Sequence, residues 1–185
     1  MSKGNLPVRA VFLVGFMGSG KTSVGRALAE LLHWCFEDLD DGIVAQEGRT
    51  VAEIFEQRGE IGFRQAEAAA LRALVEGLQP SQPTVVALGG GAFTQAENAA
   101  LLARTGHPAV CLDAPVDELW RRCEENVERP LRRDREQFKR LYAMRRADYL
   151  KATLLVDTNG REIAAIAAEI IDQLKLAPGN FPQER

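Results

Sequence analysis

Short apolar runs alternate along the chain with longer stretches in which apolar residues recur every three or four positions. The apolar runs predict strands at 9–14, 34–36, 84–88, 109–112 and 153–156, of which 9–14 and 84–88 have the pattern of buried strands. The recurring stripes predict helices at 24–32, 51–58, 63–77, 94–104, 115–123, 135–149 and 162–174. Because strands and helices alternate, we expect an α/β fold of three layers, in which a central parallel five-stranded sheet carries helices on both faces.

Local signals set several of these helix boundaries. Thr50 and Glu53 have the spacing of a capping box that would open one helix, and Thr94 and Glu97 have the spacing of a second. Gly59 is expected to end the first of these helices, because glycine commonly follows the last helical residue. The predicted helices at 51–58 and 63–77 are therefore separate.

The 185 residues are enough for one well-buried core, and no stretch has the composition of a linker between two domains. We therefore expect a single domain over 1–185. The stretch 124–134 is highly charged and has no apolar stripe, which predicts a mobile loop, and a frayed tail is expected at 177–185.

A net charge of −3 and a pI near 5.5 argue against a partner that is nucleic acid or a membrane surface, although arginines cluster between 121 and 146. No apolar stretch approaches the length of a membrane span, and the polar residues 1–7 do not resemble a signal peptide, so we expect a cytoplasmic protein. We also expect a monomer. The cysteines and histidines have no metal-binding or disulfide spacing: Cys35, Cys111, Cys123, His33 and His107.

The most informative motif follows the first predicted strand. Residues 15–22, GFMGSGKT, fit the phosphate-binding loop pattern G-x-x-x-x-G-K-[ST]. In this pattern backbone N–H groups surround a phosphate, the lysine reaches the β- and γ-phosphates, and the hydroxyl binds Mg²⁺. A strand before the loop and a helix after it provide the expected context, because the free N–H groups of the helix N-terminus point at the phosphates.

Carboxylates follow two other predicted strands, at the sheet edge where ligands of parallel sheets bind. Asp38 and Asp40 are two positions apart, so in an extended segment both side chains would lie on one face. Asp113 is a competing metal ligand, because an apolar run followed by aspartate has the form of a Walker B element. Spacing does not separate these candidates, and Asp113 also suits the start of a helix.

A glycine triplet, 89–91, follows the third predicted strand and would expose backbone N–H groups to an oxygen-rich ligand. Arg64 stands three positions before Glu67, and Arg145 stands four before Tyr149. Taken singly, each of these arginines fits an ordinary surface position.

The set of motifs, in order and spacing, resembles the shikimate kinase family over residues 11–159. Besides GFMGSGKT, the matching segments are 25–29, 38–40, 59–67, 89–91, 129–131, 145–149 and 156–159. The resemblance implies a P-loop fold of the nucleoside monophosphate kinase type, with a substrate-binding helical segment at 42–77 and a lid at 123–134. It implies ATP-dependent phosphorylation of the 3-hydroxyl of shikimate, a small-molecule substrate, in the biosynthesis of chorismate and aromatic amino acids.

On the nucleotide side, the resemblance implies that ATP is held by the phosphate loop, and that Thr22 and Asp38 serve Mg²⁺, Asp38 through water. The residues implied to bind ATP are Gly18, Ser19, Gly20, Lys21, Thr22, Ser23, Arg122, Arg129 and Asn159. Lys21 and Arg129 would also be catalytic, Arg129 as the lid arginine that stabilises charge on the transferred phosphoryl group.

On the substrate side, the resemblance implies that Asp40 is catalytic and binds the accepting hydroxyl as its base or orienting group. Arg64, oriented by Glu67, and Arg145 would bind the carboxylate of shikimate. The other residues implied to bind shikimate are Phe55 and Phe63, which would wall its ring, and Gly89, Gly90 and Gly91, of which the last two would donate N–H groups.

One position departs from the family pattern, because the usual RPLL of the lid is here Arg129-Pro130-Leu131-Arg132.

Two other functions compete with the interpretation as a shikimate kinase. A gluconate-type or other small-metabolite kinase could share the phosphate loop, but it would have less reason to combine the other motifs. A regulatory nucleotide-binding module could keep the fold, but the presence of Asp38, Asp40 and Arg129 argues for catalysis.

Overall fold

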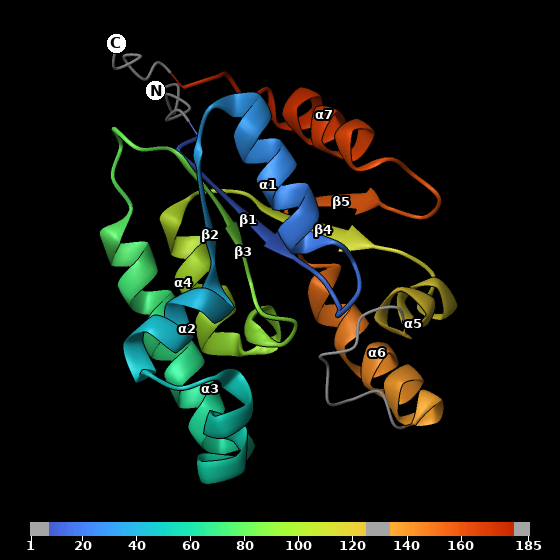
Figure 1. Ribbon diagram of the computed structural model, residues 1–185. Coiled ribbons are helices and arrows are strands. Elements are labelled where there is room, and N and C mark those ends of the chain that lie inside the picture. Colours follow the sequence, from blue (N-terminus) through green and yellow to red (C-terminus); the bar gives the residue numbers. More distant parts are fainter. Residues whose placement is uncertain (1–7, 125–133, 180–185) are drawn as a thin grey trace.

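The computed structural model describes residues 8–124 and 134–179, and in these residues the centre of the molecule is a parallel sheet of five strands (Figure 1). The strands lie in the order β2-β3-β1-β4-β5, and all neighbouring pairs are parallel. Their bounds are β1 Ala10–Val14, β2 Cys35–Asp38, β3 Thr84–Ala87, β4 Ala109–Asp113 and β5 Leu154–Asp157. The predicted three-layer α/β fold is confirmed.

Helices connect the strands and cover both faces of the sheet (Figure 1). Their bounds are α1 Lys21–Leu32, α2 Leu39–Glu47, α3 Val51–Gly77, α4 Ala96–Thr105, α5 Val116–Glu124, α6 Arg135–Tyr149 and α7 Ile163–Leu174, with a 3-10 turn, η1, at Ala92–Thr94. Within the described residues, no helix is both long and apolar enough to cross a membrane. The predicted lid at 123–134 and tail at 177–185 fall largely outside the described residues.

The alternation of side chains along β1 divides the core into two clusters. Val11 and Leu13 pack on one face with apolar residues of α1 and α7. Ala10, Phe12 and Val14 face the other side, where α3, α4 and α6 supply the partners. All of these strand residues are buried, as expected for a parallel sheet covered by helices on both faces.

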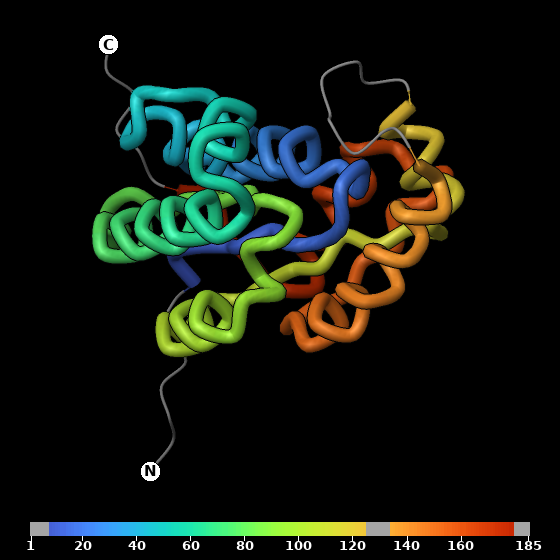
Figure 2. Tube along the Cα trace, turned by 90° about the horizontal axis from the view of Figure 1, so that it is seen from below, coloured from blue at the N-terminus to red at the C-terminus, as the bar shows by residue number. Residues whose placement is uncertain are grey.

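The strand order places the end of β1 at a point where successive connections leave in opposite directions. β1 pairs with β3 on one side and with β4 on the other, so the segments after these strands meet at one edge of the sheet. Figure 2 looks onto this edge, with α2 and α3 on one side of the end of β1 and α5 and α6 on the other. This edge is therefore the place where parallel α/β sheets usually bind their ligands.

Two predictions about helix boundaries are wrong. Thr94 does not cap α4, because it lies in the 3-10 turn and its hydroxyl donates to the Gly91 carbonyl at 2.8 Å; Gln95 is the N-cap residue. The segment after β2 is a helix rather than an extended chain, since Asp38 is the N-cap of α2 and its carboxylate accepts a hydrogen bond from Asp40 N at 3.1 Å. The capping box of Thr50 and Glu53 is confirmed.

Gly59 interrupts the helical backbone of α3 as predicted, although hydrogen bonding continues α3 from Val51 to Gly77 as one element. Its φ of 64° and ψ of −171° lie in a region that is essentially restricted to glycine. The kink turns the first part of α3, which carries Phe55, relative to the second part, which carries Phe63 and Arg64.

We predict that Gly59→Ala lowers the free energy of unfolding by about 1–3 kcal/mol, because the new side chain is strained at this φ. Gly42→Ala is the matched control. Gly42 is helical with open space around its Cα, so alanine there should raise stability by about 0.5–1 kcal/mol. Urea denaturation measures both changes, and equal effects would show that the backbone at Gly59 carries no constraint.

Candidate active site

The loop between β1 and α1 is shaped by glycines with positive φ, 138° at Gly15 and 92° at Gly20. A Cβ atom at Gly15 would lie 2.4 Å from the backbone oxygen of Leu112 in β4, so no side chain fits there. Lys21 turns back over the loop, and its Nζ donates to the carbonyls of Gly15 and Phe16 at 2.9 and 3.0 Å. The loop therefore forms a compact cradle with a lysine ammonium at its rim.

The helix that follows the cradle leaves donors for a ligand. The N-cap residue of α1 is Gly20, which has no side chain that could accept a hydrogen bond from the helix. The first N–H groups of α1 therefore point toward the loop without a capping side chain. Ser19 is buried, and its hydroxyl has no hydrogen-bond partner among the described residues. Ser23 is exposed in the first turn of α1. This arrangement suits a bound phosphate chain.

Thr22 and Asp38 come together beside the cradle, where the Thr22 hydroxyl donates to Asp38 Oδ2 at 2.9 Å. A hydroxyl and a carboxylate are oxygen ligands of the kind Mg²⁺ prefers, and Mg²⁺ usually binds through one or two carboxylates plus phosphate oxygens. The described residues contain no cluster of three or more histidine, cysteine or acidic side chains that could hold a metal alone. The residues present fit a Mg²⁺ ion that arrives with a nucleotide.

Asp113, the competing metal candidate, is engaged elsewhere. Its carboxylate accepts hydrogen bonds from the Tyr142 hydroxyl and from Arg146 Nη2, both at 3.1 Å. These partners lie on α6, so the side chain joins β4 to that helix, and it does not cap α5. The geometry favours Asp38 over Asp113 as the carboxylate of the metal site.

Asp40 lies beside the glycine turn that follows β3. A Cβ atom at Gly89 would lie 3.0 Å from Asp40 Oδ1 and 2.9 Å from Glu67 Oε1, so both carboxylates border the same point of the turn. The expectation that Asp38 and Asp40 share an extended face is wrong, because Asp40 is in the first turn of α2. At the start of α2, the Asp38 carboxylate therefore lies beside Thr22, whereas the Asp40 carboxylate lies beside Gly89.

The ion pair of Arg64 and Glu67 lies on the other side of this turn. Arg64 Nη1 donates to Glu67 Oε2 at 2.8 Å, and the side chains are only 17% and 1% exposed. The guanidinium lies against Gly91, where a Cβ atom would lie 2.5 Å from Nη1 and Nη2. Arg64 therefore presents a charged, oriented group, unlike the surface pair that the sequence alone would suggest.

Phe55 and Phe63 form the apolar wall next to Arg64. Their rings stack with centroids 4.4 Å apart, and the Arg64 guanidinium lies 5.2 Å from the centre of the Phe63 ring. Phe55 is 38% exposed, which leaves apolar ring surface available to a ligand. An apolar wall beside a fixed cation suits a small carbocyclic acid.

Arg145 reaches the glycine turn from α6. Its Nη1 donates to the Gly90 carbonyl at 3.4 Å, and the hydroxyl of Tyr149 donates to the same oxygen. Arg64 and Arg145 therefore approach the turn from α3 and α6, elements far apart in the sequence. The hydroxyl of Tyr149 is a part of the site that sequence reasoning missed, although its spacing from Arg145 was a visible signal.

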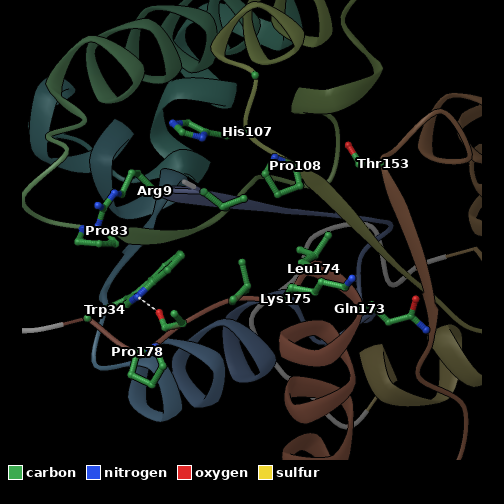
Figure 3. A pocket seen from close by; sticks show the side chains of 15 residues that line it. Arg9, Trp34, Pro83, His107, Pro108, Thr153, Gln173, Leu174, Lys175 and Pro178 are labelled. Atoms are coloured by element: carbon green, nitrogen blue, oxygen red, sulfur yellow. Dashed lines mark hydrogen bonds between the residues drawn. The ribbon is translucent and has the colours of Figure 1, made fainter. Parts of the chain in front are cut away.

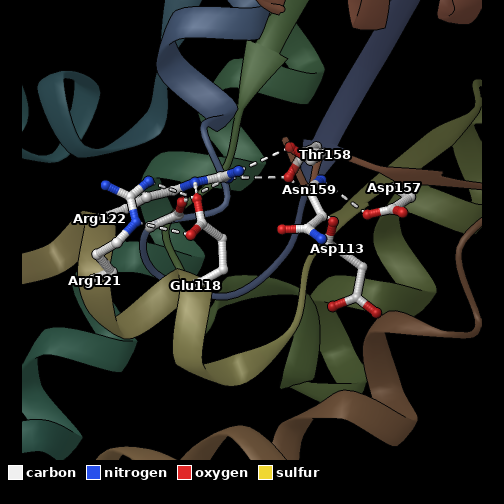
Figure 4. A network of polar contacts seen from close by, with 8 residues as sticks. Asp113, Glu118, Arg121, Arg122, Asp157, Thr158 and Asn159 are labelled. Carbon is white, nitrogen blue, oxygen red and sulfur yellow. Dashed lines mark hydrogen bonds and ion pairs between the residues drawn. The ribbon is translucent and has the colours of Figure 1, made fainter. Parts of the chain in front are cut away.

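Arg122 connects three segments beside the phosphate loop (Figure 4). Its guanidinium donates to the Thr158 hydroxyl at 3.0 Å, to the Thr158 carbonyl at 2.8 Å and to Glu118 at 2.7 Å, and it approaches the Gly18 carbonyl at 3.5 Å. The hydrogen bonds that Arg121 and, to a smaller extent, Arg122 donate to Glu118 lower the pKa of this carboxyl to about 2. Asn159, whose N–H donates to Asp157, follows Thr158 at the same place. Sequence reasoning did not identify the contribution of Thr158 and Glu118.

A cavity of about 770 Å³ opens at the other end of the sheet (Figure 3). It is lined mostly by chain segments before β1 and β4 and after α7, including Arg9, Trp34 and His107. Because the phosphate loop and the glycine turn are at the carboxyl ends of the strands, this cavity is separate from the site described above.

At one edge of a parallel sheet, a phosphate cradle and a Mg²⁺-compatible pair adjoin a glycine turn flanked by two arginines and a carboxylate, an arrangement that fits a P-loop kinase. A family model described as shikimate kinase matches residues 17–175 of this chain. The chain belongs to the shikimate kinase family.

Individual relatives agree with this assignment. A shikimate kinase from Geobacter metallireducens is 42% identical over 171 residues, which cover 91% of this chain and 93% of the relative. One from Persephonella marina is 35% identical over 169 residues, covering 91% and 100%. The solved structure of shikimate kinase from Acinetobacter baumannii in complex with shikimate has a TM-score of 0.83 at 35% identity, covering 91% of this chain and 93% of that one.

Family membership gives the activity. The protein is an ATP-dependent kinase that phosphorylates shikimate and uses Mg²⁺. The segment that carries Arg129, Pro130, Leu131 and Arg132 lies outside the described residues, so the role of Arg129 stays a prediction.

The geometry predicts that Asp38→Asn lowers Mg²⁺-dependent turnover by about 10- to 100-fold, because it removes the charge of a carboxylate at the metal site. Asp113→Asn should change turnover by less than about fivefold, since its loss weakens only a partly exposed ion pair. Steady-state rates over a range of Mg²⁺ concentrations test the ranking. The opposite ranking would make Asp113 the metal-site residue.

A second prediction concerns Glu67. Burial raises its pKa above the ordinary 4.5, and the Arg64 guanidinium opposes this shift only in part. The folded protein therefore holds this proton more tightly than the unfolded chain, and the contribution of Glu67 to stability falls as the pH rises through its raised pKa.

The measurement is the free energy of unfolding of the wild type and of Glu67→Gln between about pH 4 and pH 7. The wild type should lose stability relative to the glutamine variant, which cannot titrate, as the pH rises. A relative gain would mean that the ion pair with Arg64 outweighs the cost of burial.

Proposed function

We propose that the described residues carry out phosphoryl transfer from ATP to the 3-hydroxyl of shikimate at one crevice, with ATP on the phosphate loop and shikimate on the glycine turn. One observation carries the proposal. A Cβ atom at Gly90 would lie 3.6 Å from the backbone N of Met17, so the turn and the phosphate loop adjoin each other. Two ligands bound there would have their reacting groups side by side, which is the main requirement of this reaction.

The phosphate loop would hold the nucleotide. Lys21 would leave the carbonyls of Gly15 and Phe16 for phosphate oxygens, and the N–H groups of the loop would donate to them. Gly18, Ser19, Gly20 and Ser23 belong to this cradle. Thr22 and Asp38 would hold Mg²⁺, which neutralises phosphate charge when bound.

Asp40 would receive the hydroxyl that is phosphorylated. Its carboxylate lies beside Gly89 at the end of β3, next to the loop that would carry the phosphates. A carboxylate there can accept the hydrogen bond of the hydroxyl, orient its oxygen and take its proton as the new bond forms. Because phosphoryl transfer depends mainly on the positioning of its reactants, Asp40 can orient the hydroxyl without being a strong base.

Arg64 and Arg145 would bind the carboxylate of shikimate from two sides. Guanidinium forks match a carboxylate in geometry and charge, and Glu67 and Gly90 hold the two arginines in place. Phe55 and Phe63 would contact the ring, and the N–H groups of the glycine turn would donate to its oxygens. These contacts favour a cyclic acid over an open-chain one.

Arg122 and Asn159 would border the adenine. The Arg122 guanidinium is held by hydrogen bonds to Thr158 and lies next to Gly18 of the phosphate loop. For Arg129, which lies outside the described residues, we propose the lid role that the family resemblance implies. Charge that develops on the transferred group would be its partner.

We also propose that the protein acts as a monomer in the cytoplasm. The residues assigned to both ligands, Arg129 aside, come from described segments of one chain, and no disulfide joins Cys35, Cys111 and Cys123 to one another. Light scattering after gel filtration would test the monomer, and a dimer at micromolar concentration would overturn it.

Kinetics of three arginine variants test the functional assignment. Arg64→Ala and Arg145→Ala should each raise the KM for shikimate by about 10- to 100-fold, because a charge-assisted hydrogen bond contributes about 1.5–3 kcal/mol. The KM for ATP should change much less. Arg129→Ala should instead lower kcat, because its partner is charge present only in the transition state.

A coupled assay of ADP release, with shikimate and ATP varied separately, gives these constants, and gluconate serves as the competing acceptor. An unchanged KM for shikimate in both Arg64→Ala and Arg145→Ala would refute the carboxylate site. Faster phosphorylation of gluconate than of shikimate would refute the acceptor assignment.

A further inference from the structure

The carbonyl of Gly90 is the point at which α6 contacts the glycine turn. Tyr149, the last residue of α6, is 3% exposed, and its hydroxyl donates to this oxygen. Arg145, one helical turn earlier, donates to the same oxygen through Nη1 at 3.4 Å. A backbone carbonyl has two lone pairs, so it can accept both bonds.

The phenol of Tyr149 also contacts Arg145 directly. Burial raises the pKa of Tyr149, and the charge and hydrogen bond of Arg145 oppose this shift without cancelling it. The hydroxyl therefore stays protonated near neutral pH, donates to Gly90 and accepts from Arg145. Phenol, carbonyl and guanidinium form a closed set of contacts.

This set matters because an arginine side chain has many rotamers. Without a fixed contact, Arg145 would lose that freedom only when shikimate binds, and the cost would weaken binding. A guanidinium that is already held by buried partners loses less rotamer freedom when shikimate binds.

We propose that Tyr149 is a positioning residue that, through the Gly90 carbonyl on which both side chains meet, holds Arg145 in the arrangement that receives the carboxylate of shikimate. The inference rests on the proposed role of Arg145. Tyr149 itself need not touch the substrate.

Tyr142 supplies a matched comparison on the same helix. Its hydroxyl lies two turns earlier and bonds to Asp113 and to the Ala114 carbonyl, on the β4 side of α6. Tyr142→Phe and Tyr149→Phe each remove one hydroxyl from α6. Of these two hydroxyls, only that of Tyr149 contacts the glycine turn, so Tyr142→Phe is a control for the chemical change itself.

The experiment compares Tyr149→Phe, Tyr142→Phe, Arg145→Ala and the double variant Tyr149→Phe/Arg145→Ala. Loss of one oriented hydrogen bond should raise the KM for shikimate by about three- to tenfold in Tyr149→Phe, with the KM for ATP unchanged. Tyr142→Phe should leave both constants within about twofold of the wild type. Thermal unfolding of each variant checks that the fold is kept.

The double variant decides whether the effect passes through Arg145. If it does, adding Tyr149→Phe to Arg145→Ala should change the KM for shikimate by less than about twofold. A three- to tenfold change in that background, or equal changes in Tyr142→Phe and Tyr149→Phe, would overturn the proposal.

A neutral substrate provides a readout that does not depend on Arg145→Ala. With the carboxamide of shikimate as acceptor, Tyr149→Phe and the wild type should have the same KM, and a difference would count against the proposal. An unchanged KM for shikimate in Arg145→Ala would refute the carboxylate role of Arg145 itself. An increase in Arg145→Ala without one in Tyr149→Phe would refute only the positioning role.

Discussion

The parallel direction of the strands is the constraint on which the rest of this molecule depends. Since β1 pairs with β3 on one side and β4 on the other, the segments after these strands must emerge at one edge. The phosphate loop, the glycine turn and the β4–α5 connection therefore meet at this edge, although they are far apart along the chain. The close approach of Gly15 to the backbone of β4, where a Cβ would lie 2.4 Å from the Leu112 oxygen, shows how tightly the loop depends on its neighbouring strand.

The same edge concentrates charge that is largely removed from water. Glu67 is 1% exposed and is stabilised by Arg64, which in turn lies on a glycine because no side chain fits between them. Ionisation of such a group is costly, which is why burial raises its pKa despite the arginine. In the proposed site an oriented guanidinium would serve ligand binding, which accounts for a buried pair that costs local stability but preorganises the site.

Much of the fold and part of the site follow from the sequence. Each strand of the sheet was marked by an apolar run, and the phosphate loop by its fixed spacing, because both patterns are local and tolerate few alternatives. Helix starts were less secure. Thr94 has capping-box spacing, yet its hydroxyl bonds back to Gly91, since a 3-10 turn follows the glycines. Asp40 is expected in an extended segment, but the Asp38 side chain caps a helix there.

What the sequence could not supply are contacts between segments that are distant along the chain. Thr158 bonds Arg122, 36 positions earlier, and Tyr149 bonds Gly90, 59 positions earlier, and neither has a local pattern that names its partner. Asp113 shows the same limit, because only the placement of α6 decides that its carboxylate accepts from Tyr142 and Arg146. Residues that touch ligands recur in short motifs, whereas the residues that hold them in place are defined by packing. For that reason the partners of the Tyr149 and Thr158 hydroxyls are defined only in the folded chain, although both residues lie within motifs of the sequence.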